Sequence, residues 1–141
     1  MSREFLLQSN THDPCPTEGH GEKILVVEDN AAMRRVVVEQ LAGAGYKIFE
    51  AANALAALAI LRECTTMDLL FTDIVMVGRV GGRDLARTAV TLQPQLKVLL
   101  TSGFSESRLD EDDAVASNFR LFSKPYSKKA LLRAVREVID D

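Results

Sequence analysis

Three acidic residues stand where a metal site could form. Glu28 and Asp29 directly follow one short apolar run, and Asp73 follows another after a single threonine. Carboxylates packed together repel one another, and a hard divalent cation such as Mg²⁺ (or Mn²⁺), which prefers oxygen ligands, removes that repulsion. We expect Asp29 and Asp73 to ligate the ion directly and Glu28 to act through water. The backbone carbonyl of Val75 would complete the ligand set.

Two other polar residues could act on a group bound at Asp73. A carboxylate can serve as a nucleophile and form an aspartyl phosphate. Lys124 would then supply a positive charge for the phosphoryl oxygens, and Ser102 a hydroxyl donor. Thr101 competes with Ser102 for this role, because neighbouring residues of a strand point to opposite faces. We expect a cis peptide bond between Lys124 and Pro125, since only X-Pro bonds adopt cis cheaply.

The surrounding sequence predicts the elements that would bring these residues together. Short continuous apolar runs indicate strands buried on both faces, and they alternate with apolar residues at helical spacing. Five such units predict an α/β fold with a doubly wound parallel sheet and five helices. Ligands of such sheets bind at the carboxyl ends of the strands, where the polar residues above fall. The expected strands lie near residues 24–27, 47–51, 68–72, 95–101 and 121–122, and the weakest helix lies at 105–116.

Length and composition favour one soluble domain. The chain has 141 residues, of which 47% are hydrophobic and 26% charged. Residues 1–21 are expected to form a flexible leader or linker and residues 22–141 the domain, with no segment left for a DNA-binding output domain. Apolar runs too short to cross a bilayer, and an amino terminus without a signal peptide, predict a cytoplasmic protein without direct membrane contact. The net charge of -3 gives no reason to expect nucleic-acid binding.

The motifs around these polar residues resemble the receiver domain of bacterial two-component response regulators, over residues 23–141. The resemblance implies a flavodoxin-like strand order, 2-1-3-4-5. It also implies that Asp73 is the phosphoacceptor, Glu28 and Asp29 the acidic pair, Ser102 the switch hydroxyl and Lys124 the phosphate-sensing lysine. Residues 101–104 are similar to receivers at the carboxyl end of hybrid sensor histidine kinases. The motifs that carry the resemblance are residues 24–30, 68–76, 100–103 and 124–126.

The resemblance implies a role in a phosphorelay. A histidine kinase or a histidine phosphotransfer protein would donate the phosphoryl group in a Mg²⁺-dependent step, and the modification would switch a protein-interaction surface. The chain would catalyse its own phosphorylation and dephosphorylation without being a classical enzyme. The resemblance also allows a weak or phosphorylation-dependent dimer. Leu121 stands where many receivers place a Tyr or Phe that swings inward on activation. Such an aromatic switch would therefore require Phe122 or Phe104 to serve instead.

Three other functions fit the sequence less well. A nucleotide-binding protein of the same fold would need a Gly/Ser/Thr loop after the first strand, where this chain has Glu28 and Asp29. A phosphatase of the aspartyl-phosphate type would need a second Asp two residues after Asp73, where Val75 stands. A receiver that serves only as an interaction module would have no use for Lys124 and the acidic pair.

Overall fold

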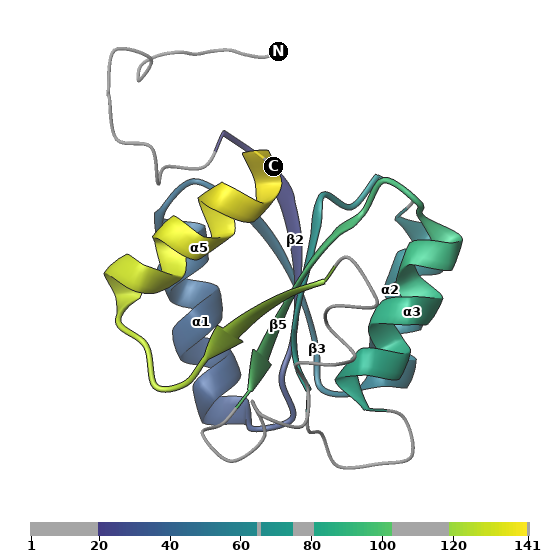
Figure 1. Ribbon diagram of the computed structural model, residues 1–141, viewed down its shortest axis with the longest axis horizontal. Helices are drawn as coiled ribbons and strands as arrows, with labels where there is room; N and C mark the ends of the chain where they lie inside the picture. Colours follow the sequence, from purple (N-terminus) through teal and green to yellow (C-terminus); the bar gives the residue numbers. More distant parts are fainter. Residues whose placement is uncertain (1–19, 65, 75–80, 103–118, 141) are drawn as a thin grey trace.

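The computed structural model describes residues 20–64, 66–74, 81–102 and 119–140. Five parallel strands form one sheet in the order β3-β2-β4-β5-β6, which is 2-1-3-4-5 when counted along the chain. This confirms the predicted fold (Figure 1). The helix expected at 105–116 and most of the expected leader lie outside the described residues. The strands are β2 (Lys23–Val27), β3 (Lys47–Ala51), β4 (Leu69–Asp73), β5 (Lys97–Ser102) and β6 (Arg120–Ser123), and the described helices are α1 (Ala31–Gly43), α2 (Ala54–Glu63), α3 (Gly82–Leu92) and α5 (Lys128–Asp140).

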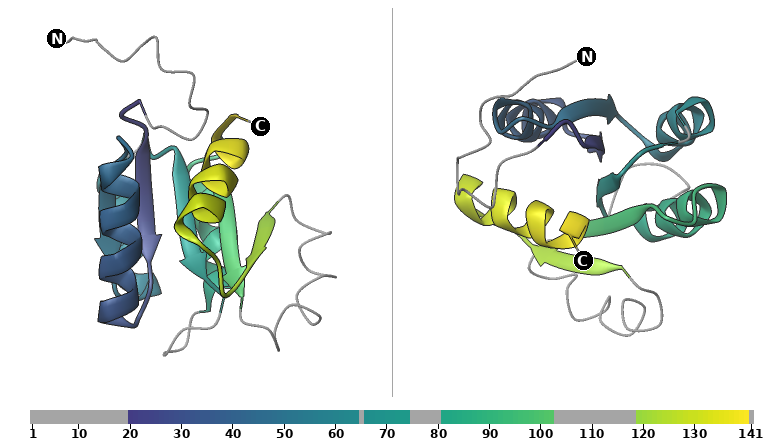
Figure 2. Two further views of the ribbon diagram at one scale, coloured as in Figure 1. Left: turned by 90° about the vertical axis from the view of Figure 1, so that its left-hand side faces the viewer. Right: turned by 90° about the horizontal axis from the view of Figure 1, so that it is seen from above.

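The described helices cover the two faces of the sheet in pairs. Helices α1 and α5 lie on one face, and α2 and α3 lie on the other (Figures 1 and 2). Strand β2 serves both faces, because alternate side chains point in opposite directions. Leu25 and Val27 pack with the α2 and α3 side, whereas Ile24 and Val26 pack with the α1 and α5 side. All four side chains are at most 1% exposed, as the continuous apolar run predicts.

Local sequence signals set the starts of two helices and the end of one. The side chain of Asn30 accepts a hydrogen bond from the Met33 amide at 3.0 Å, and Asn53 accepts one from the Ala56 amide at 2.8 Å. Both residues are the amino-terminal caps of α1 and α2, a position at which asparagine is strongly preferred. Gly45 follows the end of α1 with a φ of 104°, a left-handed conformation that favours glycine. None of the described helices is long and apolar enough to cross a membrane.

A buried glutamine fixes α2 relative to α3. Gln93 is 2% exposed and lies directly after α3. Its carbonyl oxygen accepts a hydrogen bond from the Met67 amide at 3.1 Å. Its amide group donates to the carbonyl oxygens of Leu61 at 3.0 Å and Cys64 at 2.6 Å. The side chain therefore supplies partners for backbone groups at the end of α2 and before β4, which would otherwise be left unsatisfied.

Candidate metal centre

The parallel register brings the predicted acidic residues to one edge of the sheet. Strand β2 ends beside β4, with Val27 opposite Thr72, so the chain turns at Glu28 next to the end of β4. Carboxylate oxygens of Glu28, Asp29 and Asp73 all lie within 4.8 Å of one another. The structure therefore brings together the three acidic residues that the sequence singled out. Val75, whose carbonyl was expected to complete the ligand set, lies outside the described residues.

Lys124 reaches this cluster from the loop after β6. Its Nζ lies 3.0 Å from Oδ2 of Asp73 and 3.6 Å from Oε1 of Glu28. Burial by itself would lower the pKa of Lys124, but the hydrogen bond and charge of Asp73, followed by those of Glu28, outweigh it and raise the pKa. The lysine is therefore held in its charged form. The peptide bond between Lys124 and Pro125 is cis, as predicted.

The acidic cluster is chemically suited to a divalent cation. Burial is the largest influence on Glu28 and raises its pKa; the Asn30 amide and Lys124 oppose this rise, and the charge of Asp73 adds to it. One ammonium among three carboxylates leaves an excess of negative charge in a partly buried site. Hard oxygen donors with excess negative charge are what Mg²⁺ requires, so the residues present fit the ion.

Thr101 and Ser102, the two candidates for the hydroxyl that would contact a phosphoryl group on Asp73, both lie at the end of β5. Thr101 is 2% exposed and is paired with Asp73 across the β4–β5 ladder. The backbone of Ser102 is paired with Ser123 of β6, which places Ser102 at the same edge of the sheet as the acidic cluster. The position of the Ser102 side chain is not described, so its role as the switch hydroxyl stays a prediction.

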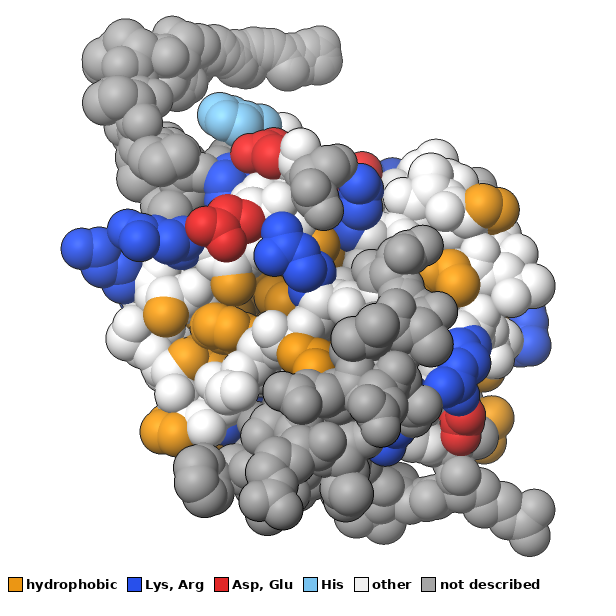
Figure 3. Space-filling model, viewed as in Figure 1, with side chains coloured by type: hydrophobic (Ala, Val, Ile, Leu, Met, Phe, Trp, Pro, Cys, Tyr) orange, Lys and Arg blue, Asp and Glu red, His pale blue; other side chains and the backbone are white. Residues whose placement is uncertain are grey.

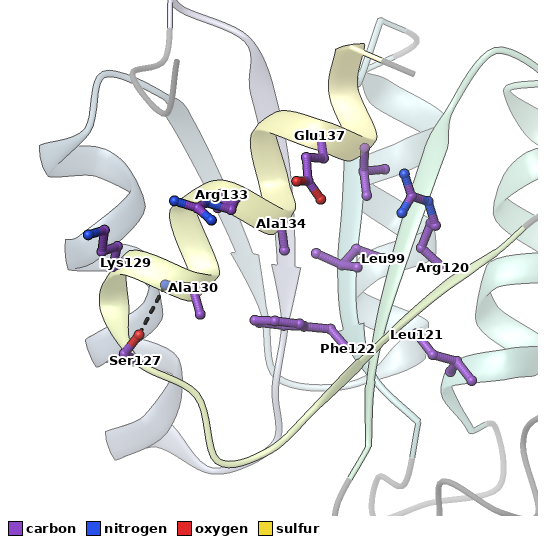
Figure 4. Close-up of a pocket in the computed structure, with 11 residues that line it drawn as sticks. Leu99, Arg120, Leu121, Phe122, Ser127, Lys129, Ala130, Arg133, Ala134 and Glu137 are labelled. Carbon is purple, nitrogen blue, oxygen red and sulfur yellow. Dashed lines mark hydrogen bonds between the residues drawn. The ribbon is translucent and has the colours of Figure 1, made fainter. Parts of the chain in front are cut away.

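The aromatic residue next to Leu121 cannot occupy its place. Leu121 and Phe122 point to opposite sides of β6 (Figure 4). Leu121 packs with the α2 and α3 side, whereas Phe122 packs with the α1 and α5 side and stacks on Tyr126 at 4.7 Å between ring centroids. Phe122 in this position is thus no substitute for an aromatic residue at 121. Phe104, the other alternative, lies outside the described residues.

Tyr126 was missed by the sequence argument as a neighbour of the acidic cluster. Burial raises the pKa of Tyr126 to about 12, and the negative charges of Glu28 and Asp73 add to the rise. Its ring also lines a hollow of about 400 Å³ beside α1, together with Met33 and Val36, which are 42% and 50% exposed. The tyrosine therefore joins the acidic edge to an apolar part of the α1 surface.

Gly82 begins α3 directly against the strand that carries Asp73. Gly82 is the first residue of α3, and Gly81 occupies the cap position before it. The amide of Gly82 donates a hydrogen bond to the carbonyl oxygen of Ile74 at 2.8 Å. A Cβ atom at residue 82 would lie 2.1 Å from the backbone oxygen of Asp73. Glycine is therefore needed because α3 begins in contact with the backbone that carries Asp73.

A second hollow lies between β6 and α5, and none of the three clustered acidic residues lines it. It measures about 500 Å³, and Figure 3 shows basic side chains gathered around apolar ones on this face. Phe122 and Ala134 point into it in the close-up (Figure 4), where the Ser127 hydroxyl also accepts a hydrogen bond from the Ala130 amide. The charged residues that line the hollow are Arg120, Lys129, Arg133 and Glu137.

Comparison with known proteins decides the family. Residues 24–136 match the response regulator receiver domain. The chain belongs to this family. It is 33% identical over 118 residues to the response regulator receiver protein CpdR of Brucella abortus (strain 2308), covering 84% of this chain and 97% of that protein. It is 31% identical to the sensor kinase CckA of the same organism, covering 83% of this chain but 12% of that kinase.

The solved structures agree with this assignment. The receiver domain from the hybrid histidine kinase CckA is 29% identical and superposes with a TM-score of 0.69, covering 83% of this chain and 98% of that structure. The chain is thus a receiver, as the motifs predicted, and receivers of two-component systems take part in phosphorelays with histidine kinases or phosphotransfer proteins.

Proposed function

We propose that Asp73 accepts one phosphoryl group from a phosphohistidine in a Mg²⁺-dependent step, and that the modified receiver changes a protein-interaction surface. The observation that carries this proposal is the meeting of Glu28, Asp29 and Asp73 within 4.8 Å, with the Lys124 ammonium 3.0 Å from Asp73. This arrangement combines a nucleophilic carboxylate, a set of ion ligands and a cation for the incoming charge.

The transfer is a displacement at phosphorus. An Asp73 carboxylate oxygen forms the new P–O bond while the P–N bond to the donor imidazole breaks, and the imidazole nitrogen keeps the electron pair. Bound Mg²⁺ would neutralise charge on the phosphoryl oxygens. Lys124 would exchange part of its contact with Asp73 for a phosphoryl oxygen, and Ser102 would donate its hydroxyl to another. These shifts at the ends of β5 and β6 would carry the signal outward.

The donor would be a histidine kinase or a histidine phosphotransfer protein. The names of two relatives support this source: the sensor kinase CckA, and sporulation initiation phosphotransferase F of Bacillus subtilis (strain 168), which is 28% identical over 118 residues. The hollow between β6 and α5 is the surface that we assign to the output, because Phe122, which lines it, lies on the strand that leads to Lys124. The chain is assigned to the cytoplasm, where such phosphodonors occur.

The experiment is phosphorylation by acetyl phosphate with and without Mg²⁺, followed by intact-mass measurement. We expect one phosphoryl group on the wild type with Mg²⁺ and none on Asp73→Asn. Asp84→Asn is the matched control, because Asp84 is an exposed aspartate on α3, and it should be labelled like the wild type. Equal labelling of Asp73→Asn and wild type would disprove the assignment. An unlabelled wild type would favour the interaction module that needs no phosphorylation.

A further inference from the structure

Arg34 joins the acidic turn to the neighbouring strand. It lies on α1, and its side chain is 19% exposed. One terminal nitrogen (Nη1) donates to the backbone carbonyl oxygen of Glu28 at 2.7 Å, and Nε lies 3.2 Å from Oε1 of Glu50 on β3. We infer that Arg34 is a positioning residue, which holds the turn between β2 and α1 in the geometry that binds the metal ion. This inference rests on the proposed metal site.

The contact acts on the peptide plane between two predicted ligands. The Glu28 carbonyl belongs to the peptide bond that joins Glu28 to Asp29, and the atoms of that bond lie close to one plane. A hydrogen bond that fixes the carbonyl oxygen therefore also fixes the direction in which the chain enters Asp29. The guanidinium is suited to this task, because its donors form a rigid planar fork.

Further hydrogen bonds hold other polar groups of the turn. The Glu28 amide donates to the carbonyl oxygen of Ala51 at 3.2 Å, and the Glu28 carboxylate accepts from the Asn30 amide at 3.1 Å. The Arg34 amide in turn donates to the Asn30 carbonyl at 2.9 Å as part of α1. Arg34 adds the bond to the Glu28 carbonyl, and its pairing with Glu50 keeps the fork in place. Without this bond, a partly buried carbonyl loses its partner and the turn can rotate.

The direction in which metal affinity changes when Arg34 is removed separates a positioning role from a purely electrostatic one. A positive charge near three carboxylates repels a metal ion, so removal of Arg34 would tighten metal binding if its charge were what mattered. If Arg34 acts by positioning, its removal weakens binding instead. Groups that orient metal ligands typically contribute about 10- to 100-fold to metal affinity. We expect the positioning effect to exceed the charge effect, because the guanidinium is paired with Glu50 and directed at a backbone oxygen.

The test is titration of the full chain with Mn²⁺, with free Mn²⁺ measured by electron paramagnetic resonance. Arg34→Ala should bind Mn²⁺ about 10-fold more weakly than the wild type. Arg34→Lys keeps the charge but loses the planar fork, so its affinity should also fall. Arg35→Ala removes the adjacent, exposed arginine of α1 and should leave the affinity within about twofold. Asp29→Asn should abolish binding and so identify the site being titrated.

Each outcome bears on one of the two ideas. Unchanged or tighter binding by Arg34→Ala would overturn the positioning role, and so would full wild-type affinity in Arg34→Lys. Far-ultraviolet circular dichroism checks that each variant is folded, and Arg34→Lys decides the matter if Arg34→Ala does not fold. A wild type that binds no Mn²⁺ would refute the metal site itself, whereas a binding wild type with unaffected Arg34 variants would refute the positioning role alone.

Discussion

Replacement of Gly82 by alanine should destabilise the fold although alanine is the better helix former. A Cβ atom at residue 82 would lie 2.1 Å from the backbone oxygen of Asp73 and 2.8 Å from Cα of Ile74. Neither atom belongs to a side chain that can turn away. The start of α3 or the end of β4 must therefore move until the contact exceeds 3.0 Å, and the hydrogen bond of 2.8 Å from Gly82 to Ile74 is then strained or lost.

Three contributions set the size of the effect. Overpacking a well-packed site costs roughly 1–3 kcal/mol, and a lost hydrogen bond costs about 1 kcal/mol. Alanine in place of glycine in a helix returns up to about 1 kcal/mol. The net loss of unfolding free energy should be about 1–3 kcal/mol, so the unfavourable contact with the backbone decides the sign.

Urea unfolding followed by circular dichroism, with EDTA present to remove metal ions, measures this free energy. Gly43→Ala is the matched control, because Gly43 is the last residue of α1 and a Cβ there meets nothing within 4 Å. The control should be neutral or up to about 1 kcal/mol more stable than the wild type. A Gly82→Ala variant as stable as the wild type would refute the argument, since it would mean that α3 and β4 separate freely.

Two further predictions concern residues away from the acidic edge. Gln93→Ala removes the partners of three backbone groups and should lower the unfolding free energy by about 2–4 kcal/mol. The control Gln95→Ala, at an exposed position, should change this free energy by less than about 0.5 kcal/mol. Similar urea midpoints for the two variants would contradict this prediction. Burial alone would raise the pKa of Glu22, but hydrogen bonds from the His20 amide and from Arg136 (2.9 Å) outweigh it and lower the pKa. This stabilisation is present above the ordinary glutamate pKa of about 4.3 and is lost as the pH falls through the lowered value. Arg136→Gln should therefore be less stable than the wild type at neutral pH by about 1–2 kcal/mol, and this difference in stability should shrink in acid. A difference that does not change with pH in urea unfolding would refute that explanation.

The positions of the strands and the acidic residues at their ends could be predicted from the sequence because both depend on local patterns, whereas the strand order was implied only by the resemblance to receivers. A continuous apolar run such as residues 24–27 identifies a buried strand, and parallel strands must present their carboxyl ends at one edge. Asn30 and Asn53 can likewise be recognised from the sequence as helix caps, because a cap acts within three residues. These signals place Glu28, Asp29 and Asp73 at one edge of the sheet, and the pairing of β2 with β4 then brings them within 4.8 Å of one another.

Contacts between distant segments were decided only by the tertiary structure. Arg34 meets Glu50 and Gln93 meets Leu61, across separations of 16 and 32 residues, and neither an arginine on a helix nor a glutamine just after one indicates such a partner. Glycine is common in turns, so the sequence around Gly82 does not show that the backbone of Asp73 lies where a Cβ atom would be. The opposite directions of Leu121 and Phe122 follow from strand alternation, but which face each meets depends on the register of β6 against β5. Periodicity and capping act between near neighbours in the chain, whereas these contacts depend on how whole helices and strands pack, which no short segment encodes.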